Sequence, residues 1–280
     1  MTCHRRRAAA LVAVLCACDG APGPAPTLTP WHTAAICQAQ GEARDDLGAV
    51  GALVLRPQRP YAMLGERLCS ATLVAATVVL TVGHCVDTRE DAVLSFTVAD
   101  QAWPDGDRSR PPVDPIEVVE VERGPAAAAA AAADVLALGR LQRPVAGVQP
   151  MPILSTPEDA AAYLVAGTAV VIAGYGRQTP PARPGWIEDD GIRRWAWSRL
   201  AAVYANCLQV GDYDQPQRCF GDSGGPTMVA TPDRGLVVIS VGSHRLGPEP
   251  CLSGTAEARL DVQADWLKAT LARLVQTSQG

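Results

Sequence analysis

The sequence predicts an all-β fold, a sandwich or a barrel, followed by one helix at the C-terminal end. Short β-branched or apolar runs recur along the chain, and Gly, Pro and Asp clusters separate them. The runs are AVGALVL (49–55), ATLVAATVVLTV (71–82), IEVVEVE (116–122), AVVIAGYG (169–176), PTMVA (226–230) and GLVVISVGS (235–243). The helix is predicted over 261–276, where apolar residues recur at helical spacing after Asp261, which can cap a helix.

The first eighteen residues have the pattern of an export signal. CHRRR supplies positive charge, and the apolar run at 8–17 is too short to cross a bilayer. The run ends in LCAC, which resembles the lipobox of bacterial lipoproteins and implies that Cys18 is lipidated. A plain signal peptide cut nearby is the alternative. In both cases a bacterial chain leaves the cytoplasm, to be lipid-anchored in the cell envelope or secreted.

The remaining chain is predicted to form a tether and one folded region. Residues 19–35 are rich in Pro, Gly and Ala without apolar periodicity, as expected for an extended tether. Folding is expected over 36–280, where we find no run long enough to span a membrane, so membrane contact is expected only through the lipid anchor. A formal net charge of −5 without a basic patch argues against nucleic acid as a partner.

Six cysteines lie beyond the export signal and Cys18. They are Cys37, Cys69, Cys85, Cys207, Cys219 and Cys251. An even number in an exported chain favours disulfides. This set holds no C-x-x-C pair and the chain shows no acidic cluster at ligand spacing, so we expect no metal and no organic cofactor.

The stretch QRCFGDSGGP, residues 217–226, presents Ser223 between glycines. GDSGG satisfies G-x-S-x-G, the nucleophile elbow of α/β-hydrolases, in which the histidine follows the serine. Here the only histidine after Ser223 is His244, and the intervening chain is too short for the rest of that fold. The elbow interpretation is therefore rejected, and an upstream histidine is required.

His84 lies in LCSATLVAATVVLTVGHCVD, residues 68–87. This segment resembles the histidine motif of the trypsin/chymotrypsin family of serine proteases. ADVLALGRL (133–141) resembles the strand that begins with the buried aspartate of that family, here Asp134. CFGDSGGP resembles the serine loop, and AGYGRQ (173–178) resembles the turn that opens the second barrel.

The resemblance covers about 36–275 and keeps the order of the family, His84, Asp134, Ser223. It implies two antiparallel six-stranded β-barrels of the chymotrypsin type with a C-terminal helix. The first barrel is expected over about 36–155, the second over about 165–260, and the helix over 261–276.

The chemistry explains why these residue types are needed. A serine hydroxyl is a weak nucleophile, so His84 would accept its proton as Ser223 attacks a carbonyl. Asp134 would hold the imidazole in the productive tautomer and stabilise the imidazolium. The N–H groups of Gly221 and Ser223 would form the oxyanion hole.

The resemblance also implies two disulfides. They are Cys69–Cys85, beside the histidine, and Cys219–Cys251, which ties the serine loop to the pocket wall. Elimination leaves Cys37–Cys207 as the third pair.

Asp222 matches the family, but the N-terminal segment that should pair with it does not match fully. In the family this aspartate pairs with a new N-terminal amine created by cleavage, for which Ile36 is the candidate here. The usual glycines are displaced, because the first comes only at Gly41. Asp222 is therefore expected to meet either the amine made by a cut between Ala35 and Ile36 or a side chain such as Arg218.

The specificity pocket departs from trypsin as well. By alignment Gln217 stands at the pocket base, Ser240 and Gly242 lie on the wall, and Glu257 replaces an aromatic residue that backs the pocket. Glu257 is expected either to attract a basic substrate side chain or to form a surface salt bridge with Arg218.

Two functions follow from these motifs. One is an exported, monomeric serine endopeptidase that hydrolyses protein or peptide substrates through an acyl-enzyme intermediate. The alternative is a catalytically silent binding protein with the protease fold and a remodelled pocket. The ordered triad favours the first, whereas the changed activation region and pocket favour the second.

Overall fold

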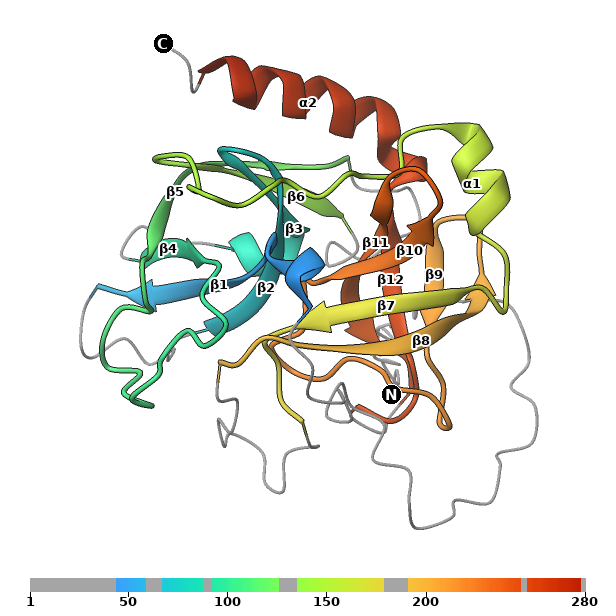
Figure 1. Cartoon of the computed structure of the whole chain (residues 1–280), viewed down its shortest axis with the longest axis horizontal. Coiled ribbons are helices and arrows are strands. Elements are labelled where there is room, and N and C mark those ends of the chain that lie inside the picture. Colours follow the sequence, from blue (N-terminus) through green and yellow to red (C-terminus); the bar gives the residue numbers. More distant parts are fainter. Residues whose placement is uncertain are drawn as a thin grey trace, which may run out of the picture.

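Two barrels and a C-terminal helix make up the described part of the chain (Figure 1). This computed structural model describes the ranges 44–58, 67–87, 92–125, 135–178, 191–247 and 251–277. Each barrel is closed, antiparallel and six-stranded, so the predicted fold class is confirmed. The barrels lie side by side, with β1 and β2 of the first in contact with β7 of the second.

The first barrel has the strand order β1-β2-β3-β6-β5-β4. Its strands are β1 (Val50–Pro57), β2 (Arg67–Ala75), β3 (Val78–Val82), β4 (Ala92–Thr97), β5 (Ile116–Arg123) and β6 (Leu136–Leu141). β-branched and other apolar side chains fill its centre. Phe96 on β4 is fully buried and covers Gly51 on β1, where a Cβ would overlap the Phe96 ring. The fit therefore needs glycine at that position.

The second barrel has the order β10-β11-β12-β9-β8-β7. Its strands are β7 (Ala169–Gly174), β8 (Arg194–Val203), β9 (Cys207–Val210), β10 (Pro226–Thr231), β11 (Gly235–Arg245) and β12 (Thr255–Arg259). The pairing of β11 with β12 shifts between Gly242 and His244. Such a bulge re-aims the side chains that follow it, and in this chain those residues border the candidate site.

Helices lie at the edges of the barrels. α2 (Ala264–Thr277) follows the short 3₁₀ helix η5 (Asp261–Gln263) and buries Leu267 and Leu274, contacting β3 and β6 of the first barrel. The sequence predicted one helix from 261, and its first turn is 3₁₀ instead. None of the helices in the described ranges is long and apolar enough to cross a membrane.

Several elements differ from the predicted strand runs. The run 71–82 is divided by a turn at 76–77 into the end of β2 and β3. The helix α1 (Pro157–Tyr163) was not predicted, although Thr156 Oγ1 accepts a hydrogen bond from Asp159 N at 3.1 Å and Pro157 begins the helix. β4, β8 and β9 also lie outside the predicted strand runs.

The N-terminal features lie outside the described residues. They include the export signal, Cys18, the tether, Ile36 and Cys37, and the same holds for Asp134. The predictions for these residues therefore stay predictions.

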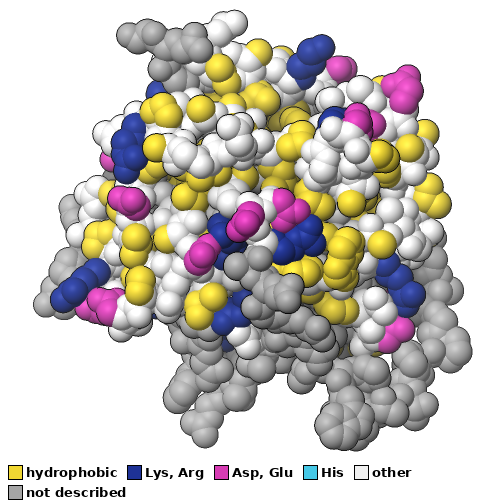
Figure 2. Space-filling model, viewed as in Figure 1, with side chains coloured by type: hydrophobic (Ala, Val, Ile, Leu, Met, Phe, Trp, Pro, Cys, Tyr) yellow, Lys and Arg dark blue, Asp and Glu magenta, His cyan; other side chains and the backbone are white. Residues whose placement is uncertain are grey.

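On the face drawn in Figure 2, basic and acidic side chains lie next to one another among apolar ones.

Candidate active site

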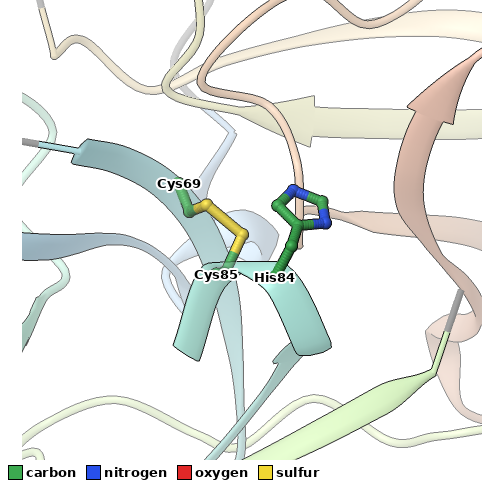
Figure 3. Close-up of side chains that lie close together, drawn as sticks. All are labelled: Cys69, His84 and Cys85. Atoms are coloured by element: carbon green, nitrogen blue, oxygen red, sulfur yellow. A yellow bond between two sulfur atoms is a disulfide. The ribbon is translucent and has the colours of Figure 1, made fainter. Parts of the chain in front are cut away.

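His84 lies in the 3₁₀ helix η3 (Gly83–Val86), directly after β3. The adjacent Cys85 forms a disulfide with Cys69 on β2, which confirms the first predicted bridge and ties η3 to the barrel wall. Figure 3 shows the imidazole and the disulfide projecting from neighbouring positions of η3. Arg67 Nη1 also donates a hydrogen bond to the carbonyl oxygen of His84 at 2.6 Å. The backbone that carries the imidazole is thus fixed from two sides.

The side chains of Cys69, His84 and Cys85 lie close enough together to suggest a metal-binding site. The ligand atoms of Cys69, His84 and Cys85 all lie within 4.8 Å of one another. A metal ligand would have to be a thiolate, and both sulfur atoms are already joined in the disulfide. The cluster therefore does not fit a metal ion.

Ser223 lies in the loop between β9 and β10. Gly221 and Gly224 on either side of it have φ of 94° and 83°, in the left-handed region that favours glycine. A Cβ on Gly224 would overlap the backbone carbonyl of Ser70. The glycines of GDSGG therefore let the serine loop turn sharply against the first barrel.

Strand β2 and helix η3 of the first barrel hold the serine loop. Ser70 N donates to the Ser223 carbonyl oxygen at 2.8 Å, and Ser70 Oγ donates to the Gly221 carbonyl oxygen at 3.0 Å. The Sγ atom of Cys85, next to His84, lies 3.5 Å from the Ser223 carbonyl oxygen. The structure thus brings the histidine segment and the serine loop together across the two barrels.

A cavity of about 300 Å³ opens between these segments, with His84 and Ser223 both on its wall. Ser223 Oγ donates a long hydrogen bond, 3.4 Å, to the carbonyl oxygen of Ser243. A bond of that length is weak, so a small rotation of the hydroxyl is enough to redirect it. Within the described residues, no backbone acceptor pairs with the N–H of Gly221 or Ser223.

Asp222 is almost fully buried beneath the serine loop. Its carboxylate accepts hydrogen bonds from Gly176 N at 2.8 Å and from Cys219 N at 2.9 Å. Burial raises the pKa of Asp222 to about 6, and these backbone donors and the charge of Arg218 offset part of the rise. A Cβ on Gly176 would lie 2.5 Å from Asp222 Cγ, which explains the glycine in the G-Y-G turn.

Of the predicted pocket residues, one borders the cavity and three are buried behind the residues that line it. Gly242 borders the cavity, but Gln217, Ser240 and Glu257 lie behind the wall. Gln217 is held there because its amide donates to the Asp212 carbonyl at 3.0 Å and accepts from Gly254 N. Residues 242–245 form the β11 side of the wall, so it begins two residues later than the alignment placed it.

Arg218 and Glu257 form a salt bridge that is buried rather than exposed at the surface. Arg218 Nε donates to Glu257 Oε1 at 2.8 Å, and the two side chains are 3% and 0% exposed. Ser240 Oγ donates to the other carboxylate oxygen at 2.6 Å. The remaining guanidinium bonds go to the Ala173 carbonyl and to Thr227 Oγ1, both at 2.9 Å. Arg218 thus bonds to Glu257 and not to Asp222.

The second predicted disulfide, Cys219–Cys251, is also confirmed and lies on the cavity wall. The pairing of Cys207 with Cys37 stays a prediction, because Cys37 lies outside the described residues.

Two positioning residues were not predicted. Ser70 links the serine loop to Tyr175, whose N–H donates to Ser70 Oγ at 3.0 Å. The Tyr175 hydroxyl donates to the Ala99 carbonyl of the first barrel at 2.7 Å. Both residues lie inside predicted motifs, 68–87 and 173–178, but the sequence analysis gave neither of them a role at the site.

Comparison with known proteins agrees with this geometry. A family model described as Trypsin matches residues 56–267. No curated protein matches the chain.

Proposed function

The chain belongs to the trypsin family, and from that premise we propose that it is a serine endopeptidase with Ser223 as nucleophile and His84 as general base. His84 takes the proton of the Ser223 hydroxyl as Ser223 Oγ attacks the substrate carbonyl. The N–H groups of Gly221 and Ser223 bind the oxyanion that forms. Asp134, which lies outside the described residues, completes the triad by orienting the imidazole.

The covalent cycle has two steps. Collapse of the tetrahedral intermediate breaks the peptide bond, and the protonated His84 gives its proton to the leaving amine. This leaves the acyl group on Ser223 Oγ. Water then attacks the ester with His84 as base, which releases the acid and restores the serine.

One observation carries the proposal. His84 from the first barrel and Ser223 from the second share the wall of one cavity, while Ser70 N bonds to the Ser223 carbonyl at 2.8 Å. A reaction that needs a nucleophile and a base from different barrels requires that both reach the same space.

We further propose that the enzyme acts outside the cytoplasm, as a monomer on proteins or peptides. The disulfides Cys69–Cys85 and Cys219–Cys251 suit an oxidising compartment. The export signal supports the same location, and Cys18 is the proposed lipid attachment site in a bacterial envelope.

The test is the substitution Ser223→Ala. We expect the variant to fold as the wild type does and to lose hydrolysis of peptide and ester substrates by about 10⁴-fold or more, because the nucleophile is gone. Ser109→Ala, in an exposed loop of the first barrel, is the matched control and should keep full activity. Comparable turnover by Ser223→Ala would refute the proposed nucleophile and favour the silent binding protein.

A further inference from the structure

The cavity beside Ser223 decides which residue the enzyme cleaves after, if the proposed function holds. The substrate residue that offers its carbonyl to Ser223 Oγ must place its side chain in the adjoining space. That space is the cavity of about 300 Å³ described above. The size and charge of its wall therefore select the substrate side chain.

The wall carries cations and no carboxylate among its described residues. Arg218 lies on it, and Arg245 lies on it at the end of β11. The disulfide Cys219–Cys251 adds an apolar surface. A lysine or arginine side chain of a substrate would thus meet positive charge first.

The nearest carboxylate lies directly behind this wall and is already satisfied. Glu257 is 1% exposed and does not border the cavity. One of its oxygens accepts from Arg218 Nε at 2.8 Å, and the other accepts from Ser240 Oγ at 2.6 Å. Arg218 therefore lies between the cavity and Glu257. Its guanidinium pairs with the carboxylate that a basic substrate side chain would otherwise bind.

The position of Arg218 is fixed by close packing. A Cβ on Gly242 would lie 2.5 Å from Arg218 Nε, so the guanidinium stem fits against the bare backbone of β11. Bonds to the Ala173 carbonyl and Thr227 Oγ1, both at 2.9 Å, hold the far end. Arg218 cannot swing aside for a substrate without leaving Glu257 as an unpaired buried charge, which is strongly unfavourable.

We propose that Arg218 takes the place of a basic substrate side chain from within the protein, so that the enzyme cleaves after uncharged residues and rejects Lys and Arg. Glu257 is then a hidden acidic site. Removal of the Arg218 side chain would join that site to the cavity and open it to cations.

The test uses binding and cleavage in parallel on the purified protein. Benzamidine, a small aromatic cation, is titrated by calorimetry into the wild type, Arg218→Ala and the double variant Arg218→Ala/Glu257→Gln. We expect binding to Arg218→Ala at least about 100-fold tighter than to the other two, because only that variant offers a free carboxylate. Equal binding by the single and double variants would overturn the assignment of Glu257.

Cleavage is measured on peptides that differ only in the residue before the scissile bond. For the wild type, kcat/KM should be highest for an uncharged residue and at least about 100-fold lower for Lys and Arg. In Arg218→Ala the ratio of basic to uncharged substrates should rise by a similar factor. Wild-type cleavage fastest after Lys, Arg or Glu would contradict the proposal.

Two further results keep the outcomes distinct. If no form cleaves any peptide but benzamidine binds only Arg218→Ala, the pocket inference stands and the proposed function fails. If Arg218→Ala does not fold, Glu257→Gln replaces it. That variant keeps Arg218 but removes its partner, so the ratio of cleavage after Glu to cleavage after Leu should rise about 10-fold. An unchanged ratio would overturn the role of the pair.

Discussion

The Asp222 carboxylate lies immediately before the proposed nucleophile and is held by the backbone N–H groups of Gly176 and Cys219. Its pKa of about 6 lies above the ordinary value of 3.8, chiefly because burial penalises the charged form. A raised acid pKa means that the folded protein binds a proton more readily than the unfolded chain. The free energy of unfolding contributed by Asp222 must therefore fall as pH rises from about 4 through about 6.

The variant Asp222→Asn tests this dependence, since an amide does not titrate. We compare the free energy of unfolding of the wild type with that of the variant at each pH. The wild-type value minus the variant value should decrease by about 3 kcal/mol or less between pH 4 and pH 7. Urea unfolding at several pH values measures the difference. A difference that is constant or that grows with pH would contradict the assigned cause of the shift.

At the same scale, the sequence indicated that Arg218 and Glu257 could pair but not where the pair lies. It paired Arg218 with Glu257 as one of two alternatives, because opposite charges near one site attract. It could not place the pair in the interior, since burial depends on strands β7, β10 and β12 closing around it. Charge is a property of the residue, whereas desolvation is a property of the fold.

Strand β2 is the element that connects the barrels at the site. Through Ser70 it bonds to the Ser223 and Gly221 carbonyls and receives the N–H of Tyr175. Ser70→Ala removes the hydroxyl and leaves the partly buried Gly221 carbonyl and the buried Tyr175 N–H without that partner. We expect the unfolding free energy to fall by about 1–3 kcal/mol.

The same substitution should lower kcat more than it raises KM, because Ser70 orients the loop that carries the proposed oxyanion donors and does not line the cavity. Ser95→Ala is the control, a buried serine of β4, which β1 separates from β2 in the barrel. An unchanged kcat in Ser70→Ala, or an equal loss in both variants, would show that Ser70 does not position the serine loop.

The elements themselves were predicted unevenly. Residues 49–55 and 226–230 were found as strands because their apolar runs are continuous. Of the two residues predicted on the β11 wall, Gly242 borders the cavity and Ser240 does not, and the pairing of β11 with β12 shifts directly after Gly242. Single-sequence patterns do not report a bulge, which depends on the partner strand.

For the whole molecule, the resemblance of three motifs to the trypsin/chymotrypsin family predicted the two barrels that the structure contains. The histidine segment and the serine loop come from distant parts of the chain and meet where the two barrels lie side by side. The route to activation is the part that the motifs left undecided. Asp222 is the residue through which the N-terminal region would act.

We predict that activity requires cleavage between Ala35 and Ile36, which would also release the enzyme from a lipid anchor at Cys18. The new amine would pair with Asp222 and lower its pKa. A form that starts at Ile36 should therefore be active and lack the fall in stability between pH 4 and 6, whereas a form with uncleaved upstream residues should be inactive and show it. Full activity of the extended form, with its N-terminus intact by mass spectrometry, would refute this requirement. Asp222 would then be held by its backbone donors.

The most direct test of the enzyme's mechanism is covalent labelling with a fluorophosphonate, followed by intact-mass measurement and peptide mapping. The probe phosphonylates a serine only when a base and an oxyanion site activate it. We predict one adduct per chain, on Ser223, and its loss in both Ser223→Ala and His84→Ala. No adduct on the folded, processed protein, or an adduct that persists in Ser223→Ala, would contradict a serine protease centred on Ser223.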